Sequence, residues 1–238
     1  MYRYVAAFLF FILGFLPLAE AATLDDLRSQ VRIVLRDTST LRPRFTDAQL
    51  TTFLNQAQEQ VNVAGWGNVK STSTALAVGT TYYTLPSDFI VATRVTKDRK
   101  NLKEITLIER DAATNNSDWE GTGGTPTAYF IDPAQPESIG VYPWPNSTSA
   151  LGTLKVYYVA QPTAMAITTD EPFNGVNKLQ EYTSLLVYHV AYRLLLTEGE
   201  TAKSEYYRKE YEYGVMNMRE RVGSKPNYNP GVSGDRGK

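Results

Sequence analysis

The spacing of hydrophobic residues changes twice along this chain of 238 residues, and this change constrains the fold more than any other feature. Apolar residues recur every three or four positions in residues 23–68 and again in residues 162–222, which indicates helices with one buried face. In residues 69–161 apolar and polar side chains alternate instead, as is typical of half-buried strands. We therefore expect an α+β protein with a helix pair at each end and a β module inserted between them.

Both helices of the first pair begin at recognisable caps. Thr23 can cap the first helix, with Asp25 and Asp26 in a first turn where the helix dipole favours carboxylates. Thr46 and Gln49 have the spacing of a capping box, which predicts the start of the second helix. Apolar residues at helical spacing mark the expected buried stripes, which are Leu24, Leu27, Val31 and Leu35 in the first helix and Leu50, Phe53, Leu54, Ala57 and Val61 in the second.

A second face of the first helix is basic. Arg28, Arg32 and Arg36 recur every four residues away from the apolar stripe. Since long charged side chains usually remain in water, we expect this face to be solvated. Pro43 separates the two helices, and Gly65 and the glycine two residues later predict the end of the second.

The central segment contains six or seven short runs rich in aromatic and β-branched residues. We expect strands near residues 82–85, 89–95, 102–107, 128–131, 138–142 and 153–159, with the second and third of these paired. Thr106 and Glu109 have capping-box spacing, which predicts a short helix there. Short strands with regular turn signals favour a small antiparallel sandwich or barrel.

The last part of the chain returns to helical spacing. We expect one largely buried helix over residues 178–196, and a fourth helix from Thr201 with a broad aromatic face. The simplest assembly of the two helix pairs is one four-helix bundle that carries the β module as an insertion. Residues 223–238 show no periodicity, and we expect an extended tail.

Residues 1–22 differ from the rest of the chain. An apolar run over residues 5–18 is followed by Ala19-Glu20-Ala21, the pattern of a secretory signal with cleavage before Ala22. Two other interpretations remain open for this leader. It could be a translated upstream extension of a gene whose functional start lies near Leu24, or an apolar arm that packs against a partner.

Composition argues against catalysis. The chain has no Cys and a single His, so thiolate chemistry is excluded and nearly every His-based metal or catalytic set is excluded too. That residue, His189, lies among apolar neighbours and is expected to be a packing or hydrogen-bonded residue. With 24 Lys and Arg against 25 Asp and Glu, only a local basic patch could bind nucleic acid. We therefore expect no catalytic, cofactor-binding or metal-binding residues and no enzyme activity.

Several short motifs follow one another in a characteristic order. The first helix is rich in Leu and Arg, and Phe45-Thr46-Asp47 precedes a second helix with an Asn-x-Ala core, Asn55-Gln56-Ala57. Further motifs follow in the β module and after it, which are Tyr82-Tyr83-Thr84-Leu85-Pro86, Gly124-Thr125-Pro126, Tyr142-Pro143-Trp144-Pro145 and Asp170-Glu171-Pro172-Phe173. Over residues 24–222 this order resembles tailed-phage head-to-tail adaptor (connector) proteins, including the tail tubular proteins below the portal.

The resemblance implies a structural role in the virion, at the head-tail junction. It implies a homo-oligomeric ring, a dodecamer by analogy, that docks on the portal protein and presents a platform for the next tail component, a nozzle or head-closure protein. Genomic DNA would pass through its channel without sequence-specific binding. The resemblance also suggests roles for two groups of residues. Lys225, Pro226, Tyr228 and Val232 of the tail would enter clefts of the portal, and Tyr206, Tyr207, Tyr211 and Tyr213 would contribute to the subunit interface.

A different class of protein remains possible if the leader is a functional signal. The chain would then be a secreted or periplasmic β-rich binding or surface-assembly protein, with Trp119, Tyr142 and Trp144 lining a ligand or partner site. This alternative lacks a convergent polar cluster beside those aromatic residues.

Overall fold

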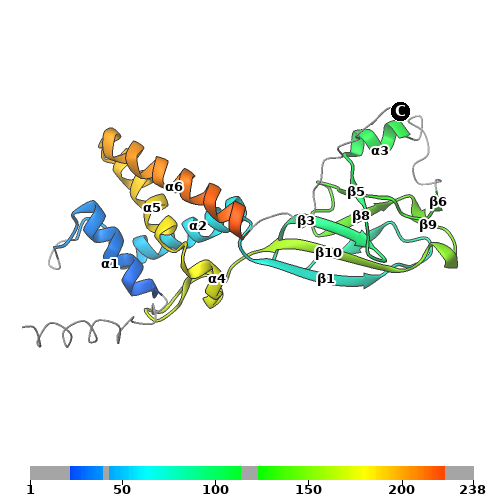
Figure 1. Ribbon diagram of the computed structural model, residues 1–238, viewed down its shortest axis with the longest axis horizontal. Helices are drawn as coiled ribbons and strands as arrows, with labels where there is room; N and C mark the ends of the chain where they lie inside the picture. Colours follow the sequence, from blue (N-terminus) through cyan, green and yellow to red (C-terminus); the bar gives the residue numbers. More distant parts are fainter. Residues whose placement is uncertain (1–21, 40–42, 114–122, 223–238) are drawn as a thin grey trace, which may run out of the picture.

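The computed structural model describes residues 22–39, 43–113 and 123–222. It is an α+β structure in which a helical region and a β module lie end to end along the long axis of the molecule (Figure 1). The tail expected at residues 223–238 lies outside the described residues, and so does the leader expected at residues 1–22, except for its last residue.

The helices of the first pair begin and end as their sequences predict. In α1 (Leu24–Leu35), Asp26 N–H donates to Thr23 Oγ1 at 3.3 Å and Thr23 N–H donates back to the Asp26 carboxylate at 2.9 Å. Thr46 and Gln49 form the same reciprocal box at the start of α2 (Asp47–Gly65). Each helix is followed by one residue in the left-handed conformation, Arg36 and Trp66, which stops the helical hydrogen bonding.

The helical region has one continuous core. Helices α1 and α2 pack with α5 (Ser184–Thr197) and α6 (Thr201–Arg221) around it. The stripes predicted for the first two helices point into this core, with Phe53 partly buried at its margin. The shared core joins the two ends of the chain as expected, although the regular packing of a four-helix bundle is not confirmed.

The prediction of a single helix over residues 178–196 is wrong. The chain forms α4 (Asn177–Gln180), then a turn, then α5. In the turn Tyr182 N–H donates to Leu179 O at 3.0 Å and Thr183 N–H to Gln180 O at 3.3 Å, which is the tighter three-residue pattern. The Thr183 hydroxyl also donates to Gln180 O at 3.0 Å, and this side-chain bond competes with helix continuation.

The face of α1 that was expected to be solvated is solvated only in part. Arg36 is exposed, but Arg28 donates to Thr51 Oγ1 and Arg32 lies between two carboxylates, Asp37 at 2.9 Å and Asp47 at 2.6 Å. The expectation was wrong for these two arginines because α2 folds back beside α1 and brings their acceptors close.

The β module contains two four-stranded sheets. The first has the order β1-β10-β3-β4 and the second the order β2-β8-β7-β5. The strands of the first sheet are β1 (Val69–Ala75), β10 (Thr153–Ala160), β3 (Phe89–Lys97) and β4 (Lys100–Asn101). Those of the second are β2 (Tyr82–Thr84), β8 (Ser138–Tyr142), β7 (Ala128–Ile131) and β5 (Lys103–Glu104).

Apolar residues from both sheets form a second core, and the sheets do not close on each other. The barrel alternative is therefore wrong. Pairing is antiparallel except where β5 joins β7 and where β6 (Gly123–Gly124) joins β9 (Trp144–Pro145).

The expected hairpin between residues 89–95 and 102–107 forms only at its turn. β3 pairs with β4 at two positions and along most of its length with β10. Leu102 enters the shared core, and the chain then crosses to the second sheet as β5, which explains why the hairpin ends there. The predicted short helix is present as α3 (Leu107–Ala113), with Thr106 and Glu109 bonded in a capping box.

Candidate interaction surface

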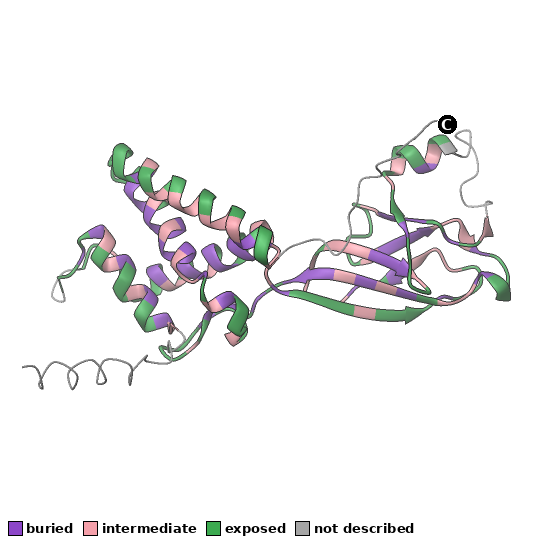
Figure 2. Ribbon diagram, viewed as in Figure 1, coloured by how far each residue is buried: buried purple, intermediate pink, exposed green. Residues whose placement is uncertain are grey.

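The four tyrosines predicted at a subunit interface lie on two different sides of α6, two on each side. Tyr207 packs against the helical core and Tyr211 does so one turn later, whereas Tyr213 is 67% exposed. Tyr206, 58% exposed, precedes Tyr213 by two helical turns and therefore lies on the same side of the helix. Figure 2 shows this alternation along α6, whose exposed residues face away from α5.

The inward tyrosines form an aromatic cluster with α5. The ring centroid of Tyr207 lies 5.9 Å from that of Tyr188, and the centroid of Tyr211 lies 5.1 Å from that of His189 and 5.9 Å from that of Tyr192. Burial raises the pKa of Tyr211 to about 12, so its hydroxyl stays neutral at any physiological pH. These two tyrosines hold α6 against α5.

His189 is a core residue, as its apolar neighbours predict. Its side chain is buried between Tyr192 and Tyr211, each with its ring centroid at 5.1 Å. Burial, with a smaller contribution from the charge of Arg193, lowers the pKa of His189 to about 4. The imidazole is therefore neutral near pH 7.

The outward side of α6 has the composition of a protein contact. Tyr206, Tyr213 and the 62% exposed Met216 form an apolar line, which we call the α6 stripe. Beside it Arg208 bonds to Glu205 and Glu212 at 2.7 and 2.9 Å, which supplies a charged margin. Exposed aromatic residues inside a polar rim are typical of the centre of protein interfaces.

Three amide side chains on α2, which we call the amide row, were not predicted as functional residues; Gln58 and Asn62 are buried and Asn55 is partly buried. Asn55, Gln58 and Asn62 follow one another at helical spacing along the side of α2 that meets the segment returning from β10. Each side chain both donates to and accepts from backbone groups, with distances of 2.7–3.0 Å. The sequence did contain a signal for these residues. The three amides recur at the same helical spacing as the apolar stripe of α2 and lie directly beside it, which is typical of polar side chains that are hydrogen-bonded at the edge of a core.

The amide row fixes the β module to the helices. Asn62 accepts from Asn68 N–H, which precedes β1, and donates to Ala160 O, the last residue of β10. The two strands that leave the helical region are thus held by one side chain that is fully buried.

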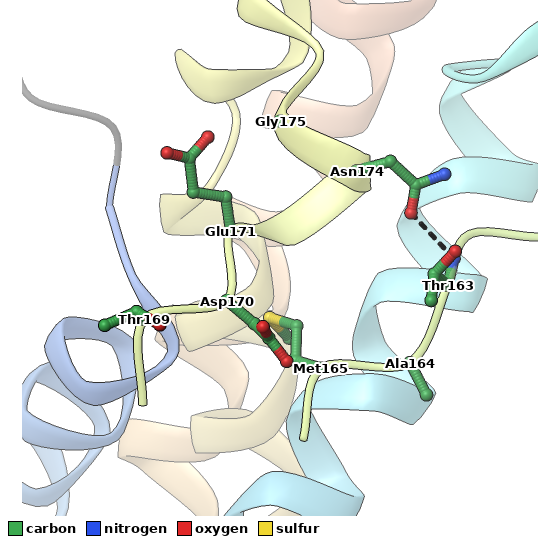
Figure 3. Close-up of a pocket in the computed structure, with 8 residues that line it drawn as sticks. All are labelled: Thr163, Ala164, Met165, Thr169, Asp170, Glu171, Asn174 and Gly175. Carbon is green, nitrogen blue, oxygen red and sulfur yellow. Dashed lines mark hydrogen bonds between the residues drawn. The ribbon is translucent and has the colours of Figure 1, made fainter. Parts of the chain in front are cut away.

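Residues of the segment 163–175 line a hollow of about 430 Å³ (Figure 3). Two of these residues, Thr163 and Met165, are hydrogen-bonded to the amide row. Two polar side chains of the hollow are hydrogen-bonded within the segment. Thr163 N–H donates to Asn174 Oδ1 at 2.8 Å, and the Asp170 carboxylate accepts from the N–H groups of Ala166 and Ile167 at 2.6 and 2.9 Å. Those backbone bonds lower the pKa of Asp170, so this carboxylate stabilises the loop as an anion.

Only some of the remaining predicted site residues lie within the described ranges. Lys225, Pro226, Tyr228 and Val232 lie outside the described residues, and so does Trp119. Tyr142 ends β8 and Trp144 lies in β9. Within the described ranges, no group of three or more His, Asp or Glu side chains is placed to hold a metal ion, and no helix is long and apolar enough to cross a bilayer.

The chain was compared with curated proteins and with protein-family models. No curated protein matched the chain. Among protein-family models, the one described as SU10 adaptor protein matches residues 22–233, which includes both helix pairs and the β module.

Proposed function

Since the chain belongs to the SU10 adaptor protein family of phage head-tail adaptors, we propose that it forms a ring that docks on the portal and extends the DNA channel. The family gives the coarser part of this statement, a structural protein of the phage virion at the head-tail junction. The ring, the portal contact and the channel are our proposal. We propose twelve copies, by analogy with the connectors that the sequence resembles.

The observation that carries the proposal is the extent of the family match. It spans residues 22–233, so the two helix pairs and the β module are covered together. An end-to-end arrangement of two regions suits a connecting role, because one end can meet the portal while the other presents a platform to the next tail component (Figure 1). That component is a nozzle or head-closure protein in our proposal.

A ring needs two different complementary surfaces on each copy. The α6 stripe supplies one of them, with Tyr206 and Tyr213 as its aromatic anchors. Tyr207 and Tyr211, which were predicted for the same interface, pack on the inner side of α6 and hold the helix that carries the stripe in place. The β module supplies further contact surface.

We propose that the tail binds the portal. Lys225, Pro226, Tyr228 and Val232 fall within the family match, which extends to residue 233. An extended segment can wrap a partner's surface and become ordered on binding. Genomic DNA passes through the ring in this proposal without base-specific contacts, as a net charge of -1 favours.

We propose that the protein has no catalytic activity. A chain without Cys and with one buried His offers few nucleophile and base combinations. The Asp170 carboxylate, which lines the hollow in Figure 3, already accepts hydrogen bonds from two backbone N–H groups of its own loop.

The test is reconstitution on the portal. The purified chain is mixed with particles of the portal protein encoded with it and imaged by cryo-microscopy, beside a chain that lacks residues 224–238 and a full-length chain with Tyr228→Ser and Val232→Ser. We expect a twelve-copy ring on the portal for the wild type, and greatly reduced docking for both variants with unchanged circular dichroism.

Two results would count against parts of the proposal. Unchanged docking of the shortened chain would remove the tail from the portal contact. A wild-type chain that stays monomeric beside the portal, with a natural N-terminus at Ala22 in the periplasm, would contradict the adaptor function and favour the secreted alternative.

A further inference from the structure

The outer face of the first sheet contains a hollow of about 800 Å³. Leu154 and Val156 of β10 point into the shared core, so Lys155 and Tyr157, which alternate with them, point outward. Arg94 lies opposite Tyr157 on the neighbouring strand β3 and therefore shares this face. Its guanidinium carbon is 4.0 Å from the centroid of the Tyr157 ring, and the Lys155 ammonium is 4.8 Å from the same centroid. Two cations thus lie against one aromatic ring.

The cations of this hollow are not neutralised by the part of the chain that the structure describes. Arg94, Arg99 and Lys155 line it, and none of them has a carboxylate within 4.0 Å among the described residues. Asp98 also lines it, but this carboxylate already accepts from Lys97 and from a backbone N–H of β10, both at 2.8 Å. We call the surface formed by the three cations the basic face.

The ionisation of Tyr157 reflects this surplus of positive charge. Lys155, with a smaller contribution from Arg94, lowers the pKa of the Tyr157 hydroxyl. The next residue, Tyr158, points into the core, and burial raises its pKa to about 12. Since a lowered pKa means that the phenolate is favoured, the outer side of β10 favours a negative charge where the inner side does not.

The residues around the hollow are polar. β1 is exposed along almost all of its length (Figure 2), and its Ser71 and Ser73 lie opposite the outward residues of β10. The exposed valines on the same side, Val69 and Val91, lie at the end nearest the helices. Lys and Ser are depleted at protein interfaces, whereas protein–DNA interfaces are more polar and much more positively charged. The composition of this face therefore favours nucleic acid over a protein partner.

We propose that the basic face binds the phosphate backbone of duplex DNA without reading its sequence. This proposal goes beyond the proposed function, in which DNA only passes through the ring. Cations and hydroxyl groups bind phosphate oxygens but carry no sequence information. Arg94, packed against Tyr157, is positioned to offer its N–H groups to a phosphate, because a guanidinium can lie against an aromatic ring and still donate from its edge.

A second copy of the chain is the other occupant that a basic face could take. It would need an acidic surface, and the second sheet does not gather its carboxylates into one. Glu104 accepts from Tyr129, which packs in the core of the module, whereas Asp132 accepts from Tyr82, whose ring meets Phe130 on the opposite side of β7. Self-association through the basic face is therefore made an outcome of the test.

The experiment measures binding of a fluorescein-labelled 30-base-pair duplex to the full-length chain by fluorescence anisotropy, from about 50 to about 200 mM salt. One variant has Arg94→Gln with Lys155→Gln, and a second has Arg99→Gln, in the exposed turn between β3 and β4. A control, Arg36→Gln with Lys178→Gln, removes two charges from exposed positions in the helical region. Folding is verified by circular dichroism, and self-association is measured by native mass spectrometry.

We expect the wild type to bind two duplexes of different sequence with affinities within about twofold of each other, because their phosphates are alike. Arg94→Gln with Lys155→Gln should weaken binding by about tenfold or more and reduce the slope of log affinity against log salt by about two. Arg99→Gln should reduce the slope by about one, and its exposed position keeps the test decisive if the double variant does not fold. The control should stay within about twofold of the wild type.

Several results would overturn the proposal. Absence of wild-type binding at about 50 mM salt would remove it, and equal losses for Arg99→Gln and the control would assign binding to overall charge. A preference of more than about tenfold between the two sequences would show that bases are read. Self-association that is lost in Arg99→Gln, with DNA binding unchanged, would assign the face to a second copy.

This test is independent of the ring. A chain that binds DNA through the basic face but forms no ring on the portal would support this proposal and contradict the proposed function. A chain that forms rings on the portal but does not bind DNA would do the reverse.

Discussion

Asp37 is the residue on which the connection between α1 and α2 depends. Its carboxylate, with a side chain only 2% exposed, accepts from Arg32 at 2.9 Å and from the N–H groups of Arg44 and Phe45 at 2.8 and 3.2 Å. We predict that Asp37→Ala lowers the free energy of unfolding by about 2–3 kcal/mol, because two backbone N–H groups lose their acceptor and Arg32 keeps only Asp47 and Phe45 O as partners.

Urea denaturation measures this loss, with Asp25→Ala as the control. Asp25 is an exposed carboxylate in the first turn of α1, so its removal should cost less than about 1 kcal/mol. Equal losses for the two variants would contradict the assigned role of Asp37.

His189 makes stability depend on pH. Its pKa is lowered from 6.5 to about 4 in the folded protein, so the unfolded chain binds a proton first as the pH falls. Stability is therefore unaffected above about pH 6.5 and falls by about 3 kcal/mol between pH 6.5 and pH 4. Urea midpoints across this range should fall for the wild type and stay nearly level for His189→Leu.

The carboxylates do not account for the same slope. The lowered pKa values of Asp47 and Asp88 move their loss of stabilisation to pH values below about 4, in the wild type and the variant alike. A slope between pH 6.5 and pH 4 that persists in His189→Leu would contradict the burial of a neutral imidazole.

At the residue scale, local pattern predicted some roles and missed others. The packing role of His189 followed from its apolar neighbours within one helix. The roles of Arg32 and Asn62 did not, because their partners lie elsewhere in the chain, at Asp47 and Ala160. A sequence can indicate that a polar side chain is buried, since the residue then stands within or beside an apolar stripe, but it does not identify the hydrogen-bond partner that makes the burial favourable.

At the scale of elements, the connection between α2, β1 and β10 depends on Asn62. We predict that Asn62→Ala lowers the free energy of unfolding by about 2–3 kcal/mol, since two buried backbone groups lose their partner. Gln56→Ala, on the exposed side of the same helix, is the matched control and should change stability by less than about 0.5 kcal/mol. Hydrogen exchange at Asn68 and Ala160 gives a local readout, and unchanged protection of these amides would contradict the coupling.

The elements themselves were largely predictable where the signal is local. The caps at Thr23, Thr46 and Thr106 each set a helix start that the structure contains. The break before α5 was missed. It arises because the Thr183 hydroxyl donates to Gln180 O, a carbonyl that would otherwise accept from a backbone N–H of a continuing helix. The transfer of β5 to the second sheet was missed because strand pairing is decided by the shared core, which no short window of sequence contains.

At the scale of the whole molecule, substitutions in the α6 stripe should affect ring assembly without affecting folding. We predict that Tyr206→Ala with Tyr213→Ala leaves the free energy of unfolding within about 0.5 kcal/mol, because both side chains are mostly exposed, and weakens ring formation. Tyr207→Ala should instead destabilise the fold by about 2 kcal/mol, because it removes a partly buried aromatic ring that packs against the helical core. Urea denaturation and native mass spectrometry of the same samples distinguish the two, and rings of normal stability from the double variant would exclude the stripe from the interface.

The division of the chain into helix pairs and a β module followed from hydrophobic period alone. The function did not, because a chain with no catalytic set offers only the order of its motifs, and the family match over residues 22–233 is what connects that order to phage adaptors.

The most direct test of the adaptor account is a focused cryo-microscopy reconstruction of the portal vertex in purified virions. The account predicts a ring of twelve copies of this chain directly below the portal, with the helical region and the β module fitting the density as one elongated subunit. A vertex whose density below the portal belongs to other proteins, in virions from which this chain is absent by mass spectrometry, would contradict it.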